Sequence, residues 1–329
     1  RQVARLLPMD ECIGLMETVL AALARGEAFL PLRSILWLPD RKGALGLMPA
    51  FLSAERALGV KAVTFFPQNE GTELDSHQGA VLLFDSERGS LEAVIDATSV
   101  TAIRTAAVSG AATRLLARTG AGDLALVGSG VQAATHLAAM LAVRRIRRVR
   151  VASRDFSAAC TFAQRQSRRH RIAIEPVASV REAVAQADIV CTVTSSREPV
   201  VLGDWLAPGA HVNAVGSSVA SARELDAAAV ARSRLYVDRR ESALSEAGDF
   251  LIAKREGAVG DGHIVGEIGE VLTGKAPGRG SDAEITLFKS VGLAVEDVAC
   301  ARHIAEKARN EPVGVIPRFE LGGGRDEGD

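Results

Sequence analysis

The stretch from Asp123 to Arg154 limits the possible folds of this chain more than any other. It contains a short apolar strand, the turn Gly128-Ser-Gly-Val-Gln-Ala133, a helix-like run and a second strand ending near residue 152. The first glycine permits a tight turn, the second lets the backbone approach a pyrophosphate, and the alanine allows close helix packing. The stretch predicts a dinucleotide-binding unit, with phosphates at the helix N-terminus. The alternative is a glycine turn in an ordinary α/β protein. The turn residues expected to bind cofactor are Gly128, Ser129, Gly130, Val131 and Gln132.

The end of the second strand indicates which cofactor is bound. An acidic residue that binds the ribose hydroxyls of NAD is expected about 20 residues past the glycines. Ser153 and Arg154 stand there instead. A guanidinium and a hydroxyl suit a 2′-phosphate, which a carboxylate would repel. We therefore expect NADP(H) to be preferred, with NAD(H) possible. In the alternative interpretation, Arg154 stacks on the adenine.

The composition excludes several classes of protein. The chain has 329 residues, is 47% hydrophobic and has a formal net charge of −1, which predicts a soluble globular protein without bulk attraction for nucleic acid or membrane. The four scattered cysteines and six histidines show no spacing typical of a metal site or a disulfide framework, and free cysteines fit the cytoplasm. No apolar run approaches the ~20 residues of a membrane span. The N-terminus lacks a signal pattern.

Two kinds of pattern divide the chain. A helix over 10–26, ending at Gly26, precedes mainly antiparallel strands at 33–38, 44–48, 59–66, 80–85 and 91–96, and a small-residue helix over 101–117. From Asp123 onward strands and helices alternate, which predicts a parallel sheet with strands at 124–127, 148–152, 172–176, 189–193, 211–215 and 234–237. Helical segments are expected after residue 240, with 297–307 as the last, before a disordered tail at 321–329.

This organisation predicts an α/β fold with two domains. A substrate and dimerisation domain spans 1–118 and is completed by a C-terminal helix at 296–320, while a Rossmann NAD(P)-binding domain spans 119–295. Loops at the carboxyl ends of parallel strands line the ligand crevice. The loop residues expected to bind cofactor are Thr194, Val215, Gly216 and Ser217.

Several separated motifs together resemble the ornithine cyclodeaminase and μ-crystallin family from about residue 30 to 307. They are Leu32-Arg33, Gly46-Leu-Met48-Pro49, Lys61, Ser76-His-Gln78-Gly79 with the following apolar run, Thr101-Ala-Ile-Arg104-Thr105, the glycine turn, Asn213-Ala-Val-Gly216, Glu267-Ile-Gly-Glu270, and Phe288 to Asp297. The resemblance implies a Rossmann-like domain joined to an N-terminal α+β domain. It also implies a homodimer whose N-terminal sheets combine across the interface.

The family has two chemistries, and Ser218 bears on the choice between them. Ornithine cyclodeaminase uses NAD to oxidise, cyclise and reduce its substrate, whereas the μ-crystallin type uses NADPH to reduce a cyclic ketimine carboxylate. The cyclodeaminases carry an aspartate in a Gly-Ala-Asp-x-Pro-Gly segment, where this chain has Ser218. A serine cannot act as a carboxylate base or counter-ion. Ser218, as a substrate-binding residue, and Arg154 therefore favour an imine reductase.

The resemblance also implies the residues of the chemistry. Arg33 and Arg104 match carboxylate-binding arginines, and a guanidinium suits a carboxylate bidentately; a surface ion pair is the alternative for Arg33. Lys61 lies on a strand face with apolar neighbours, where a lysine is costly unless it is paired or catalytic. A snorkelling lysine is its alternative. Glu267 is a candidate catalytic group near the substrate nitrogen, with a structural ion pair as the alternative.

The remaining candidates are assigned by motif. Met48 and Gln78 are expected in the substrate pocket, with core packing as the alternative for Met48. Thr105 and Gly292 are expected at the cofactor. Asp297 is interpreted as a helix or ion-pair residue.

These observations predict an NAD(P)H-dependent reductase of small cyclic imino acids. The competing hypotheses are ornithine cyclodeamination or a related amino-acid dehydrogenase, and a protein that binds NADPH and a small ligand without turnover.

Overall fold

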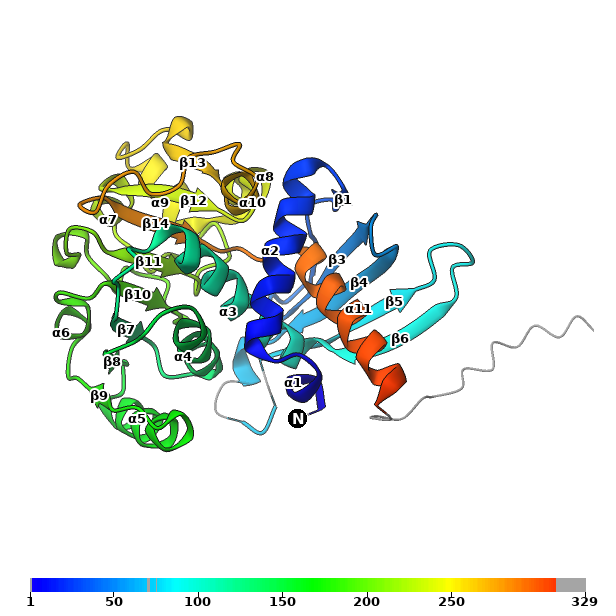
Figure 1. Cartoon of the computed structure of the whole chain (residues 1–329), viewed down its shortest axis with the longest axis horizontal. Helices are drawn as coiled ribbons and strands as arrows, with labels where there is room; N and C mark the ends of the chain where they lie inside the picture. The colour runs from blue at the N-terminus through cyan, green and yellow to red at the C-terminus, as the bar shows by residue number, and fades with distance from the viewer. Residues whose placement is uncertain (1, 70–71, 75, 312–329) are drawn as a thin grey trace, which may run out of the picture.

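The chain folds into two sheets that lie side by side. Helix α3 (Ala97–Leu116) contacts elements of both sheets and the helices beside them (Figure 1). The structure is a computed structural model that describes residues 2–69, 72–74 and 76–311. One sheet is antiparallel and six-stranded; the other is parallel and eight-stranded. This confirms the predicted α/β class with a Rossmann-like sheet. The predicted tail at 321–329 lies outside the described residues, and the exact domain limits stay a prediction.

The antiparallel sheet has the strand order β1-β3-β4-β5-β6, with β2 also paired to β3. Its strands are β1 (Ala28–Phe29), β2 (Ser34–Trp37), β3 (Ala44–Leu52), β4 (Ala57–Phe65), β5 (His77–Phe84) and β6 (Leu91–Asp96). All five predicted strands are present, although β3 continues beyond its predicted end at Met48. Helices α2 (Met9–Arg25) and α11 (Ala294–Asn310) pack beside each other, and α11 lies on β3, β4 and β5 (Figure 1). A short helix, α1 (Gln2–Leu6), precedes them.

Helix α2 follows its predicted pattern. Its apolar stripe, which includes Ile13, Met16 and Leu20, is buried, and Gly26 ends the helix in the left-handed conformation with a φ of 80°. Helix α11 covers the first part of the predicted segment at 296–320; residues beyond 311 are not described. Cys12 and Cys300 are distant in sequence, yet their sulfurs lie 3.8 Å apart where the two helices meet.

Helix α3 begins earlier than the predicted Thr101. The Asp96 carboxylate accepts hydrogen bonds from the N–H groups of Thr98 and Ser99, which caps the helix at its true start. Most of its side chains are small and buried, and a Cβ on Gly110 would lie 3.0 Å from Cδ1 of Ile13. The small-residue sequence therefore lets α2 and α4 (Val131–Val143) pack closely on both sides.

The parallel sheet has the order β13-β12-β14-β11-β10-β7-β8-β9. Its strands are β7 (Asp123–Val127), β8 (Arg148–Ala152), β9 (Ile174–Pro176), β10 (Ile189–Thr192), β11 (His211–Ala214), β12 (Ser233–Val237), β13 (Ile264–Glu267) and β14 (Ile285–Lys289). The chain leaves β7 for β8 on one side and later returns to β10 on the other, which makes β7 and β10 the switch point where a ligand crevice opens.

The helical segments expected after residue 240 are present, but they do not make up the whole of that region. That region also forms β13 and β14, and β14 is wholly buried between β11 and β12. A short apolar run does not distinguish a buried strand from a buried helical segment, so the sequence pattern left this strand ambiguous. Because β14 leads directly into α11, it connects the parallel sheet back to the antiparallel one.

Helices flank the parallel sheet, and three short 3-10 turns complete the described elements. The other helices are α5 (Phe156–His170), α6 (Val180–Val184), α7 (Ala227–Ala231), α8 (Arg240–Glu246), α9 (Gly248–Arg255) and α10 (Ile268–Leu272), and the turns are η1 (Pro67–Asn69), η2 (Gly203–Trp205) and η3 (Asp261–His263). Within the described ranges, no helix has both the length and the apolar character that a membrane crossing requires.

Candidate functional site

The glycine turn joins β7 to α4 at the switch point of the parallel sheet. Gly128 has a φ of +116°, and a Cβ there would lie 2.9 Å from the carbonyl oxygen of Val193. Gly130 is the N-cap of α4; no side chain caps the helix, and a Cβ on this glycine would meet nothing within 4 Å. In the part of the chain that the structure describes, the buried Oε1 of Gln132 has no hydrogen-bond partner. Uncapped N–H groups beside open space fit the diphosphate of a dinucleotide.

The end of β8 lies next to this turn. The Ser129 hydroxyl donates a hydrogen bond to the Ser153 hydroxyl at 3.0 Å. This bond links the glycine turn to the position where a ribose-binding residue is expected. Arg154 follows and is exposed. The carboxylate of Asp155 accepts from the N–H of Ser157 at 2.9 Å and caps α5, so the acid beside Arg154 already has a structural role.

The loops after β10 and β11 are held by a residue that the sequence reasoning missed. The buried carboxylate of Glu224 accepts hydrogen bonds from the N–H and hydroxyl of Thr194 and from the N–H of Gly216. Burial, followed by the charge of Asp249, raises the pKa of Glu224. Val215 and Ser217 of the second loop are buried, with the Ser217 hydroxyl donating to the Ala222 carbonyl, and Ser218 is half-buried.

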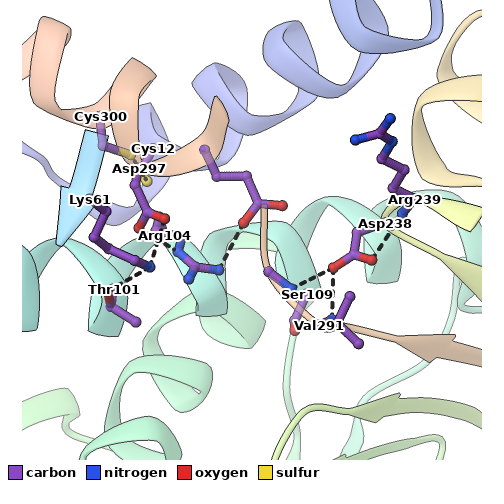
Figure 2. Close-up of polar contacts among 12 residues, drawn as sticks. Cys12, Lys61, Thr101, Arg104, Ser109, Asp238, Arg239, Val291, Asp297 and Cys300 are labelled. Carbon is purple, nitrogen blue, oxygen red and sulfur yellow. Dashed lines mark hydrogen bonds and ion pairs between the residues drawn. The ribbon is translucent and has the colours of Figure 1, made fainter. Parts of the chain in front are cut away.

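Two residues expected at the substrate, Lys61 and Arg104, form one buried charged network with Asp297. Lys61 of β4 and Arg104 of α3 both bind Asp297 of α11, with Lys61 Nζ 2.7 Å from Oδ2 and Arg104 Nε 3.0 Å from Oδ1 (Figure 2). Nζ of Lys61 also lies 3.5 Å from the Thr101 hydroxyl. Lys61 is 3% exposed, and burial lowers its pKa to about 8 despite the attraction of Asp297. The ion-pair interpretation of Asp297 is confirmed.

Glu296 binds the other side of the Arg104 guanidinium. Its Oε2 accepts from Nη1 of Arg104 at 2.8 Å, while its Oε1 is buried without a hydrogen-bond partner among the described residues. Burial raises the pKa of Glu296 to about 7, against the attraction of Arg104. Between them, the two acids raise the pKa of Arg104 although burial opposes this. Nη2 of Arg104 has no hydrogen-bond partner among the described residues, so this nitrogen is available for a ligand.

Arg33 and Arg104 meet at Gly292. Nη2 of Arg33 donates to the carbonyl oxygens of Val291 and Gly292 at 2.6 and 2.9 Å, and lies 2.8 Å from Oε2 of Glu246. A Cβ on Gly292, whose φ is +79°, would lie 2.6 Å from Nη1 of Arg104. Glycine is therefore needed here for close approach to a guanidinium.

Asp238, which directly follows β12, holds the backbone at Val291 and Gly292 in place. Its Oδ2 accepts from the N–H groups of Val291 and Gly292, both at 2.7 Å, and Figure 2 shows it beside Val291. The predicted contact of Gly292 with cofactor stays a prediction.

The other motif residues lie at different distances from this network. Met48 is buried directly opposite Lys61 in the β3–β4 pairing, whereas Gln78 is exposed near the start of β5, opposite Thr64. Thr105 is buried in α3 next to Arg104. Their roles stay predictions.

Glu267 has structural contacts. Its side chain belongs to the capping box of α10, and Oε1 accepts from the N–H of Arg240 at 2.8 Å. This geometry favours a structural role, although as a helix cap and not as the ion pair considered from the sequence. A catalytic role for Glu267 gains no support from these contacts.

The residues missed by sequence reasoning are buried acids: Glu224, Asp238, Glu246, Asp249 and Glu296. Each binds a partner far away in the sequence or in a loop, so its contacts could not be inferred from local spacing; Glu296 lies within the Phe288 to Asp297 motif but was not singled out there. No group of three or more His, Cys, Asp or Glu side chains placed to hold a metal ion occurs in the described part of the chain.

Comparison with known proteins places the chain among relatives of similar length. Residues 1–311 match the profile of the Ornithine cyclodeaminase/mu-crystallin family. The ketimine reductase mu-crystallin of Mus musculus is 41% identical over 290 residues, covering 87% of this chain and 88% of the relative.

Two solved structures are similar throughout. The Δ1-pyrroline-2-carboxylate reductase of Thermococcus litoralis, in complex with NADH and L-proline, superposes with a TM-score of 0.94 at 40% identity and covers 96% of this chain and 98% of its own. An archaeal alanine dehydrogenase dimer with bound NAD gives a TM-score of 0.91 at 34% identity, covering 97% of each chain. The chain therefore belongs to the ornithine cyclodeaminase/mu-crystallin family.

Proposed function

We propose that this protein reduces cyclic imino acids of the Δ1-pyrroline-2-carboxylate or Δ1-piperideine-2-carboxylate type, with NAD(P)H as the hydride donor. The observation that carries the proposal is the meeting of Arg33 and Arg104 at Gly292, in contact through Asp297 with Lys61. Two guanidiniums and one ammonium suit a substrate that has a carboxylate beside a basic nitrogen. Relatives named for reduction of such substrates support this assignment.

The chain's own residues bind and orient the substrate. The cofactor, held at the glycine turn, supplies the hydride when it is bound. Asp297 and Glu296 bind Nε and Nη1 of Arg104, so the guanidinium is held in one orientation and Nη2 is positioned to bind a substrate carboxylate. Arg33 is fixed in the same way by Glu246 and the carbonyl of Gly292. Pre-oriented guanidiniums reduce the entropy lost on reaching a reactive geometry.

Lys61 supplies a proton to the ring nitrogen as the C=N bond becomes an amine. With a pKa of about 8, its ammonium is mostly protonated at neutral pH yet gives up its proton more readily than an ordinary lysine. Asp297 keeps Nζ in place.

The direct test incubates purified protein and NADPH or NADH with a panel of cyclic imino acids and amino acids. The absorbance of the reduced nicotinamide is recorded over time. Oxidation of the reduced cofactor with the imines is the expected result. Proline and ammonia formed from ornithine with catalytic NAD would instead establish cyclodeamination, against the argument from Ser218. If neither cofactor is oxidised with any imine, the proposed activity is wrong.

NADP(H) is proposed as the preferred cofactor because Ser153 and Arg154 directly follow β8, where the residue that binds the ribose is expected, and the Asp155 carboxylate already caps α5. Arg154→Ala is expected to weaken NADPH binding roughly tenfold, the cost of one charge-assisted contact, with NADH binding nearly unchanged. Titration of nicotinamide fluorescence measures both affinities. An equal loss for the two cofactors would instead indicate adenine stacking.

A homodimer is proposed through the antiparallel sheet. Strand β2 pairs only with β3 in the described sheet, and its apolar residues Ile35, Leu36 and Trp37 are exposed, with Leu36 at 64%. An exposed apolar edge strand of this kind is typical of a surface that another protein chain buries. The dimeric state of the alanine dehydrogenase supports the proposal.

Leu36→Glu is expected to convert the dimer to a monomer, because the interface would then bury an unpaired carboxylate. Light scattering after size-exclusion chromatography measures the mass. Leu202→Glu alters an exposed leucine that directly precedes η2 and lies outside the antiparallel sheet, so it should leave the mass unchanged. A wild-type protein that is already monomeric would refute the proposal.

A further inference from the structure

Glu224 lies between two loops that the sequence assigns to the cofactor. It is fully buried, and its two carboxylate oxygens accept four hydrogen bonds. Oε1 accepts from the N–H of Thr194 at 2.6 Å and from its hydroxyl at 2.7 Å. Oε2 accepts from the Thr192 hydroxyl and the N–H of Gly216, both at 2.7 Å. Each oxygen therefore holds one hydroxyl and one loop N–H group.

Only a carboxylate can satisfy this arrangement. Four donors point at one side chain, and an ionised carboxylate has the acceptor positions for all of them. Burying the charge is costly, which is why the pKa of Glu224 is raised. The N–H groups of Glu224 and Leu225 donate to Oδ1 of Asp249, whose other oxygen lies 3.0 Å from the buried ammonium of Lys289. Glu224 is thus itself held in position by a buried ion pair.

The two loops contact each other, and the loop after β10 also contacts the glycine turn. A Cβ on Gly216 would lie 2.1 Å from the carbonyl oxygen of Thr194 and 2.5 Å from Oε1 of Glu224, so only glycine allows this approach. The missing side chain of Gly128 faces the carbonyl of Val193, the residue before Thr194. A displacement of either loop would therefore reach the dinucleotide turn.

We propose that Glu224 is a positioning residue for the cofactor: its carboxylate clamps the loops at Thr194 and Gly216 in the arrangement that binds NAD(P)H. The proposal rests on the proposed function only in that the chain binds NAD(P)H. The carboxylate acts through the two loops and touches no reacting atom.

Glu224→Gln tests the clamp with almost no change in shape. In either orientation of the amide, one of the two oxygens becomes an NH₂ group, which faces either the N–H of Thr194 or the N–H of Gly216. A hydroxyl can rotate to accept from an NH₂ group, but a backbone N–H cannot. One loop is therefore released, and we expect the dissociation constants of NADPH and NADH to rise at least tenfold, about the worth of one charge-assisted hydrogen bond.

Thr192→Val is the matched control. It removes one donor to the same carboxylate in the same buried region, yet leaves both loop N–H groups bound. Cofactor affinity should stay within about twofold of the wild type, although some stability is lost. Nicotinamide fluorescence gives the affinities, and urea unfolding of the unliganded proteins gives the stability. If Glu224→Gln does not fold, Gly216→Ala forces the same loops apart with the carboxylate intact and should weaken cofactor binding similarly.

Wild-type affinity in Glu224→Gln, or equal weakening in Glu224→Gln and Thr192→Val, would overturn the clamp; where Glu224→Gln does not fold, wild-type affinity in Gly216→Ala would do so. The clamp and the proposed function fail in distinguishable ways. A wild-type protein that binds NAD(P)H but reduces no imine refutes the function and leaves the clamp standing. Normal imine reduction with an unchanged dissociation constant in Glu224→Gln refutes the clamp alone.

Discussion

Arg104→Lys is expected to lower kcat/KM for a cyclic imino acid on the order of 10²-fold, mainly through KM, because the charge-assisted hydrogen bond from Nη2 to the substrate carboxylate depends on the guanidinium. Asp297 and Glu296 hold Nε and Nη1 of this group, and its third nitrogen remains for a ligand. Lysine has one nitrogen and cannot bind both acids and a substrate in a fixed fork. Steady-state kinetics with a varied imine measure the effect.

Lysine is chosen because it keeps the positive charge. Alanine would leave Glu296 buried without its cationic partner and Asp297 with Lys61 alone, at a cost of roughly 3–5 kcal/mol in folding stability. The NADPH dissociation constant of Arg104→Lys should match the wild type. Arg302→Lys, in an ion pair at the surface of α11 with Glu92 and Glu306, is the matched control and should keep normal kinetics. A KM within a few-fold of the wild type in Arg104→Lys would exclude the guanidinium from substrate binding.

Local signals explain what could be predicted from the sequence. The glycine turn combines a strand, two glycines and a helix within a few residues, and each part has a direct backbone cause. Arg104 was identifiable because a charged arginine within a run of alanines and threonines is unusual unless its side chain has a specific partner or function. The start of α3 shows the limit of such signals: the Asp96 cap was present in the sequence, but the small-residue run drew the predicted start to Thr101.

Apart from Asp297, the acids of the site could not be predicted because their partners are remote. Glu296 binds a guanidinium 192 positions earlier in the chain, and Asp238 reaches N–H groups beyond residue 290. An isolated Asp or Glu in a sequence is most often a surface residue. Only the late insertion of β14 between β11 and β12 brings α11 and its acids to Arg104, and that strand was the element that the pattern left ambiguous.

Lys61→Arg is expected to lower kcat for imine reduction by roughly 10²- to 10⁴-fold, the usual contribution of a positioned proton donor. Arginine keeps the charge that Asp297 needs, but its guanidinium holds its proton too tightly to transfer it. The wild-type rate should fall as pH rises through about 8, because the protonated ammonium is the donor and is lost above that pH. Below that value the donor is present, so this limb of the profile is flat.

The pH profile separates Lys61 from its neighbours. Glu296, with a pKa of about 7, would affect the acidic side of the profile, through its contact with Arg104. In Lys61→Arg the limb near pH 8 should disappear while any acidic limb remains. A profile that keeps its limb near pH 8 in this variant, at near wild-type rate, would show that the proton comes from another group. Loss of the limb together with the slow rate would assign the proton to Nζ of Lys61.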